Sequence, residues 1–286
     1  MTDCVVIFGT GLIGGSLALA LREAARVKRL IGFGRDAENL RVARKAGVID
    51  EIGSDPAQVA QADVVVLAVP VGQMGSVMAA IAPHLGPHTV VTDVGSTKQD
   101  VIALARTHLK ERLARFVPAH PIAGAEKSGV RAARADLFRD RLVVITPLAE
   151  TDPAARSQVA DLWTACGARI VELTPREHDE VFAAVSHLPH VLAFALVDYI
   201  AAQKEAARLF ALAASGFRDV TRIAASSPEM WRDICLANRE ALLQHLTGYQ
   251  EELEHLRALI AAGDGQALVE RFTRARDARR RFLGES

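Results

Sequence analysis

Residues 4–16 read CVVIFGTGLIGGS, an apolar run that leads directly into a glycine-rich loop. Residues 4–8 predict a short buried strand, and the alanine-rich residues after the loop predict a helix. This strand–loop–helix context is what distinguishes a dinucleotide-binding G-x-G-x-x-G motif from a chance match or an ordinary α/β turn. In the motif Gly9 permits a tight turn, Gly11 lets the backbone approach a pyrophosphate, and Gly14 lets helix and strand pack closely. The helix N-terminus then favours the diphosphate, because its unpaired N–H groups and its dipole attract an anion.

The rest of the first half alternates strands with helices. Residues 63–70 form a continuous run rich in β-branched residues, as expected of a strand buried on both faces of a parallel sheet. Such alternation predicts an α/β fold, a Rossmann-like, doubly wound and mostly parallel sheet. Residues 119–136 are predicted to be a long polar loop. The other predicted strands are residues 29–33, 88–94, 115–118, 142–146 and 168–173, and the predicted helices are 17–25, 37–46, 71–85, 153–166 and one that starts at the turn 95–98 and ends at residue 109.

The pattern changes near Thr174, after which the sequence predicts helices and no strand. Breaks are expected at Gly216 and Gly263. We therefore expect two domains, a dinucleotide-binding domain at residues 1–173 and an all-helical domain at residues 174–286. The predicted helices of the second domain, rich in Ala, Leu, Glu and Arg, are residues 177–199, 201–215, 228–260 and 266–283.

Composition limits the range of functions. The chain has 286 residues, 50% hydrophobic and 24% charged, with a formal net charge of zero. These values are typical of a soluble folded protein and give no indication of nucleic-acid binding or of a general affinity for anionic membranes. The N-terminus enters a strand almost at once, which argues against a secretory signal, and the apolar run at residues 64–71 is too short to span a bilayer. Cys4, Cys166 and Cys235 are far apart, which favours buried free thiols in a reducing cytoplasm.

Polar side chains at strand ends are the first candidates for chemistry, because ligands of such sheets lie beyond the carboxyl ends of the strands. Val69 and Pro70 end one predicted strand, Ser96 follows the next, and His120 follows another. Ser96 and His120 are the polar groups best placed to reach a nicotinamide ring. Histidine exchanges a proton near neutral pH, as oxidation of an alcohol requires. The alternative roles are an N-cap for Ser96 and a backbone-fixing loop residue for His120.

A second polar cluster lies in the helical half. Residues 186–190, SHLPH, place His187 and His190 three positions apart, and the proline between them indicates a kink or a helix start. Arg218 and Arg222 follow in the same largely apolar half, and arginine is suited to bidentate carboxylate binding. Together these residues predict a site for an anionic substrate. We predict no metal site, because no carboxylate or thiol stands at matching spacing from the two histidines.

Five segments of the chain resemble the prephenate and arogenate dehydrogenase family. They occur in the family's order and span most of the sequence. The glycine loop is shared with many dehydrogenases, whereas the histidine–proline loop together with the two helical motifs is far more specific. The segments read GTGLIGGS from Gly9, TDVGSTK from Thr92, HPIAGAEKSG from His120, SHLPH from Ser186 and SGFRDVTRI from Ser215.

The resemblance implies an oxidative decarboxylation in tyrosine biosynthesis. The substrate is a cyclohexadienol with a ring carboxylate and a side-chain carboxylate. A hydride goes to the nicotinamide, and loss of carbon dioxide makes the ring aromatic. The resemblance also implies a homodimer formed through the helical domain. The first strand starts at Cys4, which leaves no room for a chorismate mutase segment, so we expect a monofunctional enzyme.

The resemblance also assigns roles to residues. It implies that His120 accepts the hydroxyl proton or hydrogen bond, assisted by Ser96. His190 and Arg222 hold the substrate, with Arg222 as the carboxylate partner. His187, Glu126 and Trp231 complete the expected substrate site, and Arg218 is the alternative carboxylate partner. With the strand-end residues included, the expected cofactor-binding residues are Gly9, Thr10, Gly11, Leu12, Ile13, Gly14, Arg35, Val69 and Pro70.

The end of the second strand bears on NAD against NADP. An NAD enzyme commonly has an acid there, about 20 residues beyond the loop. This chain has Gly34 at that position, then Arg35, which can pair with a 2′-phosphate. Asp36 has two interpretations, a ribose partner or the N-cap of the next helix, and we favour the cap. The sequence therefore leans weakly to NADP.

Two alternative functions remain open on sequence grounds. A β-hydroxyacid dehydrogenase or an imine reductase would share the architecture but would carry a catalytic lysine or aspartate in its helical domain, and we find no such motif. A non-catalytic NADP-sensing module would need the glycine loop but not Ser96, His120 and the cationic cluster together. The sequence does not separate prephenate from arogenate, nor does it decide whether tyrosine inhibits.

Overall fold

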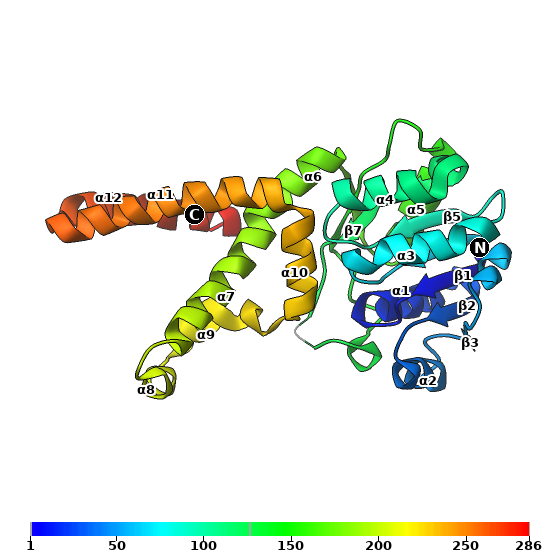
Figure 1. Cartoon of the computed structure of the whole chain (residues 1–286), viewed down its shortest axis with the longest axis horizontal. Coiled ribbons are helices and arrows are strands. Elements are labelled where there is room, and N and C mark those ends of the chain that lie inside the picture. Colours follow the sequence, from blue (N-terminus) through cyan, green and yellow to red (C-terminus); the bar gives the residue numbers. More distant parts are fainter. Residues whose placement is uncertain (1, 126, 286) are drawn as a thin grey trace. The chain divides into compact units, whose positions relative to one another are not determined.

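A six-stranded parallel sheet is the centre of the computed structural model, which describes residues 2–125 and 127–285 (Figure 1). Its strand order is β3-β2-β1-β4-β5-β6, so the order reverses between β1 and β4. Ligands of open α/β sheets bind at such a switch point. The predicted α/β class is confirmed, and of the strands in this sheet the two-residue β3 is the one that the sequence analysis missed. The strands are β1 (Thr2–Phe8), β2 (Val27–Phe33), β3 (Glu51–Ile52), β4 (Val64–Leu67), β5 (Val90–Asp93) and β6 (Phe116–Val117).

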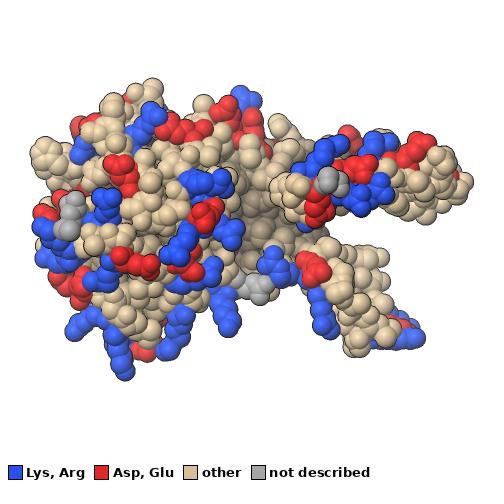
Figure 2. All heavy atoms as spheres, turned by 180° about the vertical axis from the view of Figure 1, so that it is seen from behind, with Lys and Arg blue, Asp and Glu red and all other residues tan. Residues whose placement is uncertain are grey.

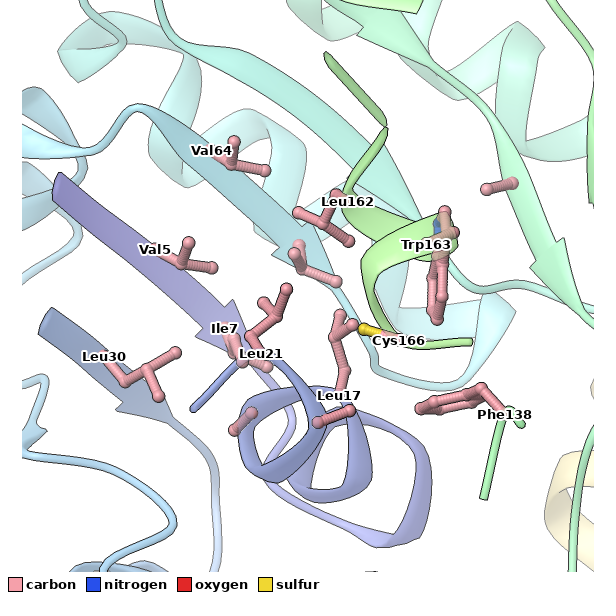
Figure 3. Close-up of a cluster of buried hydrophobic side chains, with 14 of the residues drawn as sticks. Val5, Ile7, Leu17, Leu21, Leu30, Val64, Phe138, Leu162, Trp163 and Cys166 are labelled. Atoms are coloured by element: carbon pink, nitrogen blue, oxygen red, sulfur yellow. The ribbon is translucent and has the colours of Figure 1, made fainter. Parts of the chain in front are cut away.

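Helices cover both faces of this sheet. Along β1, Val5 and Ile7 belong to a core shared with α1, α2 and α5, whereas Val6 and Phe8 belong to a core shared with α3 and α4. Figure 3 shows the first of these cores, in which Leu17 of α1 lies close to the strands. Both faces of β1 are thus buried, which explains its continuous apolar sequence. The helices are α1 (Leu12–Glu23), α2 (Ala37–Lys45), α3 (Val71–Ile81), α4 (Gln99–Leu109) and α5 (Pro153–Ala165), joined by the 3₁₀ turns η1 (Pro56–Gln61), η2 (Ala82–His84), η3 (Lys110–Arg115) and η4 (Val130–Ala132).

A second sheet has three strands and shares a hydrophobic core with the main sheet. It consists of β7 (Ala119–Pro121), β8 (Leu142–Ile145) and β9 (Arg169–Glu172), with β7 antiparallel to β8 and β8 parallel to β9. The prediction of a loop from residue 119 is therefore wrong for its first three residues. His120 pairs with Val144 in β8, so a strand and not a loop holds the candidate catalytic residue.

The described chain after residue 174 is helical, with no strand. Gly216 lies inside α9, so the predicted break there is wrong, whereas Gly263, at φ +68°, does end α11. The predicted helix 228–260 is interrupted at Asn238, and only a short part of 201–215 is helical. The elements are α6 (Pro175–Phe182), the π-helical turn η5 (Ala183–His187), α7 (Leu188–Ala201), α8 (Ala206–Ala211), α9 (Ser215–Thr221), η6 (Arg222–Ala225), α10 (Pro228–Ala237), α11 (Arg239–Ala262) and α12 (Gly265–Leu283).

The chain divides into two compact units, Met1–Arg239 and Glu240–Ser286. The first unit includes the start of the helical half, because α6 packs on α4 and α10 packs on α3 (Figure 1). The second unit contains α12 and nearly all of α11, and it leaves large apolar side chains exposed, such as Ile260 and Phe282.

The distribution of charged side chains on the surface agrees with the balanced composition of the chain. On the face drawn in Figure 2, basic and acidic side chains are interspersed, as expected for zero net charge.

One helical stretch among the described residues, Pro175–Ala201, is long and apolar enough to cross a membrane by length and composition. The sequence analysis considered uninterrupted apolar runs and so missed this stretch, in which Ser186, His187 and His190 interrupt the apolar residues.

Candidate active site

In the glycine loop, a side chain would clash with the backbone at two of the three motif glycines, whereas the third has free space beside it. Gly9 adopts φ +100°, and a Cβ there would lie 2.2 Å from the Ala68 carbonyl oxygen. A Cβ on Gly14 would lie 2.0 Å from the Gly9 carbonyl oxygen. At Gly11 a Cβ would meet no described atom within 4 Å. The fold therefore requires glycine at Gly9 and Gly14, whereas Gly11 leaves the space that a diphosphate needs for close approach to the backbone.

The N-terminus of α1 is suited to an anion. The helix begins at Leu12, five residues earlier than predicted, so Leu12 and Ile13 lie in its first turn. Its N-cap, Gly11, offers no side chain, and no described side chain caps the helix. Its first N–H groups are therefore directed to the space beside Gly11, and the loop fits a dinucleotide on these grounds.

Asn39, which the sequence analysis did not single out, holds the loop in place. Its Nδ2 donates to both the carbonyl oxygen and Oγ1 of Thr10 at 3.0 Å, and its Oδ1 accepts from the Val130 N–H at 3.0 Å. The expected loop residue Thr10 thus faces α2. A signal for Asn39 would have been its place in the first turn of the helix after the second strand.

The structure at the end of β2 confirms that Asp36 is the N-cap of the next helix. The Asp36 carboxylate accepts hydrogen bonds from the N–H groups of Glu38 at 2.9 Å and Asn39 at 3.1 Å, so it is the N-cap of α2. Arg35 is exposed beside it. At the end of β4, half-buried Val69 precedes exposed Pro70, which caps α3.

His120 is the end of a three-residue hydrogen-bonded chain. Its Nδ1 lies 2.8 Å from His178 Nε2, and His178 Nδ1 lies 2.8 Å from Asp179 Oδ1. Phe182 packs against both imidazoles, with ring centroids 4.9 Å from His120 and 4.6 Å from His178. The sequence analysis missed His178 and Asp179, because a polar first turn on a helix is usually solvated.

Burial keeps the two imidazoles neutral. It lowers the pKa of His120 well below its usual value, and the nearness of His178 and the positive charge of Lys98 act in the same direction. Burial also lowers the pKa of His178, although the hydrogen bond to Asp179 opposes this. For Asp179, burial alone would raise the pKa, but hydrogen bonds from His178 and from the N–H of Gln99 lower it. Near neutral pH the chain is therefore two neutral histidines and a carboxylate.

Asp179 also caps α4. Its Oδ1 accepts from the Lys98 N–H at 2.8 Å, and its Oδ2 accepts from the Gln99 N–H at 2.9 Å. The N-cap interpretation of Ser96 is therefore wrong, because the helix begins at Gln99 and receives its cap from α6. A backbone hydrogen bond instead joins Ser96 to the His187 ring.

A buried ion pair fixes the residue before His120. The Lys98 ammonium pairs with the Asp93 carboxylate, and both side chains are fully buried. Lys98 Nζ donates to the Ala119 carbonyl oxygen at 2.8 Å, and Asp93 Oδ1 accepts from the Ala119 N–H at 3.2 Å. The pair therefore ties the end of β5 to the start of β7 and sets the position of His120.

His187, at the end of η5, and His190, in α7, meet at Trp231 on α10. The His190 ring stacks on the indole at 3.7 Å between centroids, and the His187 ring lies at 6.0 Å. The turn η5 is π-helical just before Pro189, as expected where a proline withholds an N–H from the helix. Burial lowers the pKa of His187 to about 4. Asn238, at the helix interruption, reaches both the His187 ring at 3.2 Å and the Asp179 carbonyl oxygen at 2.7 Å.

The remaining residues predicted to bind the substrate are Arg222, Arg218 and Glu126. Arg222 lies in η6, which packs on α7. Burial of His190 lowers the pKa of that residue, and the positive charge of Arg222 lowers it further. Arg218 is exposed on α9, one turn earlier. Glu126 lies outside the described residues. Over the described residues, His, Cys, Asp and Glu form no cluster of three that could hold a metal ion.

The fold and the glycine loop define a dinucleotide-dependent oxidoreductase. The family model for the nucleotide-binding domain of prephenate dehydrogenase matches residues 17–172, and the model for the prephenate dehydrogenase dimerization domain matches residues 174–274. The chain therefore belongs to the prephenate dehydrogenase family.

Named relatives agree with this family. The chain is 40% identical to a prephenate dehydrogenase of Bacillus subtilis, over 98% of this chain and 76% of that one. It is 38% identical to a cyclohexadienyl dehydrogenase of Zymomonas mobilis, over 96% and 94% of the two chains. Aquifex aeolicus prephenate dehydrogenase, solved with hydroxyphenyl propionate and NAD⁺, superposes with a TM-score of 0.92 at 35% identity over 99% of both chains. A Synechocystis arogenate dehydrogenase gives 0.81 at 30% identity, over 98% and 99%.

Proposed function

We propose that the chain catalyses NAD(P)-linked oxidative decarboxylation of prephenate or arogenate, with His120 as the base. The observation that carries the proposal is the placement of the half-buried His120, whose imidazole contacts the His178–Asp179 chain and whose neighbour Ala119 is held by the Lys98–Asp93 pair. The surroundings lower the pKa of His120, so its imidazole is neutral near neutral pH. A neutral imidazole can accept the hydroxyl proton of the substrate. The Bacillus subtilis and Synechocystis relatives support the two substrates.

The reaction balances with one base and one hydride acceptor. A bound nicotinamide supplies the hydride acceptor. His120 takes the hydroxyl proton while the carbon that bears the hydroxyl loses its hydride, which gives a ring ketone. The bond to the ring carboxylate then breaks and carbon dioxide leaves. The electron pair passes through the ring to the ketone oxygen, which makes the ring aromatic, and the resulting phenolate takes back the proton held by His120. Ser96 is proposed to assist His120 at the hydroxyl.

Substrate binding is assigned to the cluster around Trp231. His190 stacks on this indole, and His187 approaches it at the ring edge. Arg222, whose charge acts on His190, is the proposed partner of a substrate carboxylate, and Arg218 is the alternative. Glu126 keeps its proposed place in the substrate site.

For the cofactor we infer a preference for NADP. Asp36 is already engaged as the cap of α2, and Gly34 has no side chain, so Arg35 remains the exposed charged group at the end of β2. An arginine there pairs with a 2′-phosphate. The test is kcat/KM with each cofactor for the wild type and for Arg35→Ala. A wild type that prefers NAD, or an unchanged NADP value in the variant, would remove Arg35 from this role.

We further propose a cytoplasmic homodimer, divided at residues 173 and 174 into a dinucleotide-binding and a helical domain. The helical domain matches a dimerization domain and exposes large apolar side chains, Val185 at 66% and Leu212 at 74% among them. A second copy would bury these side chains and the exposed face of the stretch Pro175–Ala201. Light scattering on the full chain tests the dimer, and a monomer at micromolar concentration would contradict it.

The catalytic assignment is tested by His120→Asn. We expect kcat to fall by about 100-fold or more, the usual scale for general acid–base catalysis, with cofactor affinity little changed. Reduction of the nicotinamide with prephenate, arogenate and a panel of β-hydroxyacids compares the proposed reaction with the alternatives. Turnover of the variant within a few-fold of the wild type would overturn the role of His120.

A further inference from the structure

We propose that His178 and Asp179 are positioning residues that hold His120 in the tautomer a base needs. This inference rests on the proposed function, since it concerns the same reaction. Neither residue belongs to the motifs that point to the family. Both come from α6, 58 and 59 positions beyond His120 in the sequence, and the fold brings them to it.

The hydrogen-bond directions follow from the ionised carboxylate. Asp179 can only accept, so His178 Nδ1 carries a proton and donates it at 2.8 Å. The neutral His178 ring then has a lone pair on Nε2, and His120 Nδ1 must carry the proton that fills the 2.8 Å contact. The remaining nitrogen of His120, Nε2, is therefore left with a lone pair. That lone pair is the group that can accept a substrate proton.

The surrounding charges show why such a chain is needed. The charged or titratable groups that act on His120 are His178, Lys98 and His187, and all of them disfavour a positive charge on its ring. The carboxylates that act on His178 are Asp179 and Asp93, and Asp93 is already paired with Lys98. When His120 becomes an imidazolium, Asp179 is thus the carboxylate whose charge reaches it, through His178.

The surroundings of His178 indicate that it acts through His120 and not on the substrate. Its side chain is fully buried, and Phe182 packs against both rings. Asp179 is bonded to the N–H groups at the start of α4, which fixes its orientation. The arrangement matches the role of a third group that orients a catalytic base.

A matched pair of variants at His178 separates orientation from packing. Gln places its amide oxygen where Nε2 stands and so keeps an acceptor for His120 Nδ1, whereas Asn reaches only the position of Nδ1. Both side chains are smaller than histidine, so both variants leave a cavity at position 178, and a loss that came from packing alone would appear in both. We expect His178→Asn to lower kcat about 100-fold or more and His178→Gln to lower it less than about 10-fold, with KM little changed in both.

The pH profile tests the carboxylate. In Asp179→Asn the imidazolium of His120 loses its compensating charge, so its pKa falls further. The acidic limb of kcat should then move to lower pH while the plateau drops by about 100-fold or more, toward the roughly 10⁴-fold known for the orienting aspartate of serine proteases. Gln99→Ala is the control, because its side chain bonds only the other oxygen, Oδ2. Circular dichroism and cofactor binding report whether each variant is folded.

The outcomes distinguish this inference from the function on which it rests. If His120→Asn is inactive while His178→Asn and Asp179→Asn stay within a few-fold of wild type, the positioning role is overturned and the proposed function stands. Equal losses in His178→Asn and His178→Gln, with an unmoved acidic limb in Asp179→Asn, also overturn it in favour of packing. If His120→Asn turns over normally, both proposals fall.

Discussion

Alanine substitutions at Gly11 and Gly14 separate the requirements of the fold from those of the ligand. Both glycines belong to the same loop and lie three residues apart. A Cβ at Gly14 would lie 2.0 Å from the Gly9 carbonyl oxygen and 3.0 Å from both Ala68 Cβ and a methyl of Ile7. The closest of these is a backbone atom, so no rotamer change can relieve the clash. A Cβ at Gly11 would meet no described atom within 4 Å.

The expected magnitudes follow from these contacts. Overpacking typically costs about 1–3 kcal/mol, and a backbone clash places Gly14→Ala at the upper end. With about 2–4 °C lost per kcal/mol in a chain somewhat smaller than this one, we expect its melting temperature to fall by roughly 5–10 °C. Gly11 has φ −78°, which alanine adopts without strain, so Gly11→Ala should melt within about 2 °C of wild type.

Cofactor titration supplies the second measurement. The methyl of Gly11→Ala would occupy the space of the diphosphate, so we expect its Kd for NAD(P) to rise about tenfold or more, which is about 1.4 kcal/mol. Thermal unfolding without cofactor and fluorescence titration with it are run on both variants. Wild-type affinity in Gly11→Ala, or equal destabilisation of the two variants, would refute the assignment of the open space to the cofactor.

Three other predictions concern stability and binding. Because burial lowers the pKa of His187 to about 4, the unfolded chain binds a proton first as the pH falls below about 6.5, and up to roughly 3 kcal/mol of stability should be lost between these values. Denaturant titrations across this range check it, and a flat profile would contradict it. Arg222→Ala should raise KM strongly, since a lost charge pair costs about 2–5 kcal/mol, and an unchanged KM together with a raised one in Arg218→Ala would reverse the assignment. Asp36→Ala should cost about 1 kcal/mol as a lost N-cap and leave the ratio of NADP to NAD activity unchanged, whereas a changed ratio would make Asp36 a ribose partner.

Local sequence patterns predicted the features that depend on neighbours in the chain. The strand, glycine loop and helix at the N-terminus were predicted because they follow one another directly in the sequence, and because the Gly14 contact is with the nearby Gly9 carbonyl oxygen. The repeated apolar runs likewise predicted the parallel sheet. The Asp36 cap could be read from its place before a helix.

Features that depend on distant partners were not predictable. β7 has three residues including Pro121, too short and too irregular for a period-two pattern, and it exists because β8 pairs with it. The cap of α4 comes from Asp179, 81 residues beyond Lys98, so the nearer Ser96 was the better local candidate and was wrong. His178 looked like one more polar residue in a first helical turn. Its burial against His120 becomes visible only once α6 is packed on α4.

The most direct test of the proposed reaction follows both products at once. Prephenate with its ring carboxylate labelled is incubated with the full chain and NAD(P), and reduced nicotinamide and released labelled carbon dioxide are counted together. We expect one carbon dioxide for each nicotinamide reduced in the wild type, and both products to form at least about 100-fold more slowly in His120→Asn. Nicotinamide reduction without release of carbon dioxide, or no reduction with either prephenate or arogenate, would contradict an oxidative decarboxylation at this site.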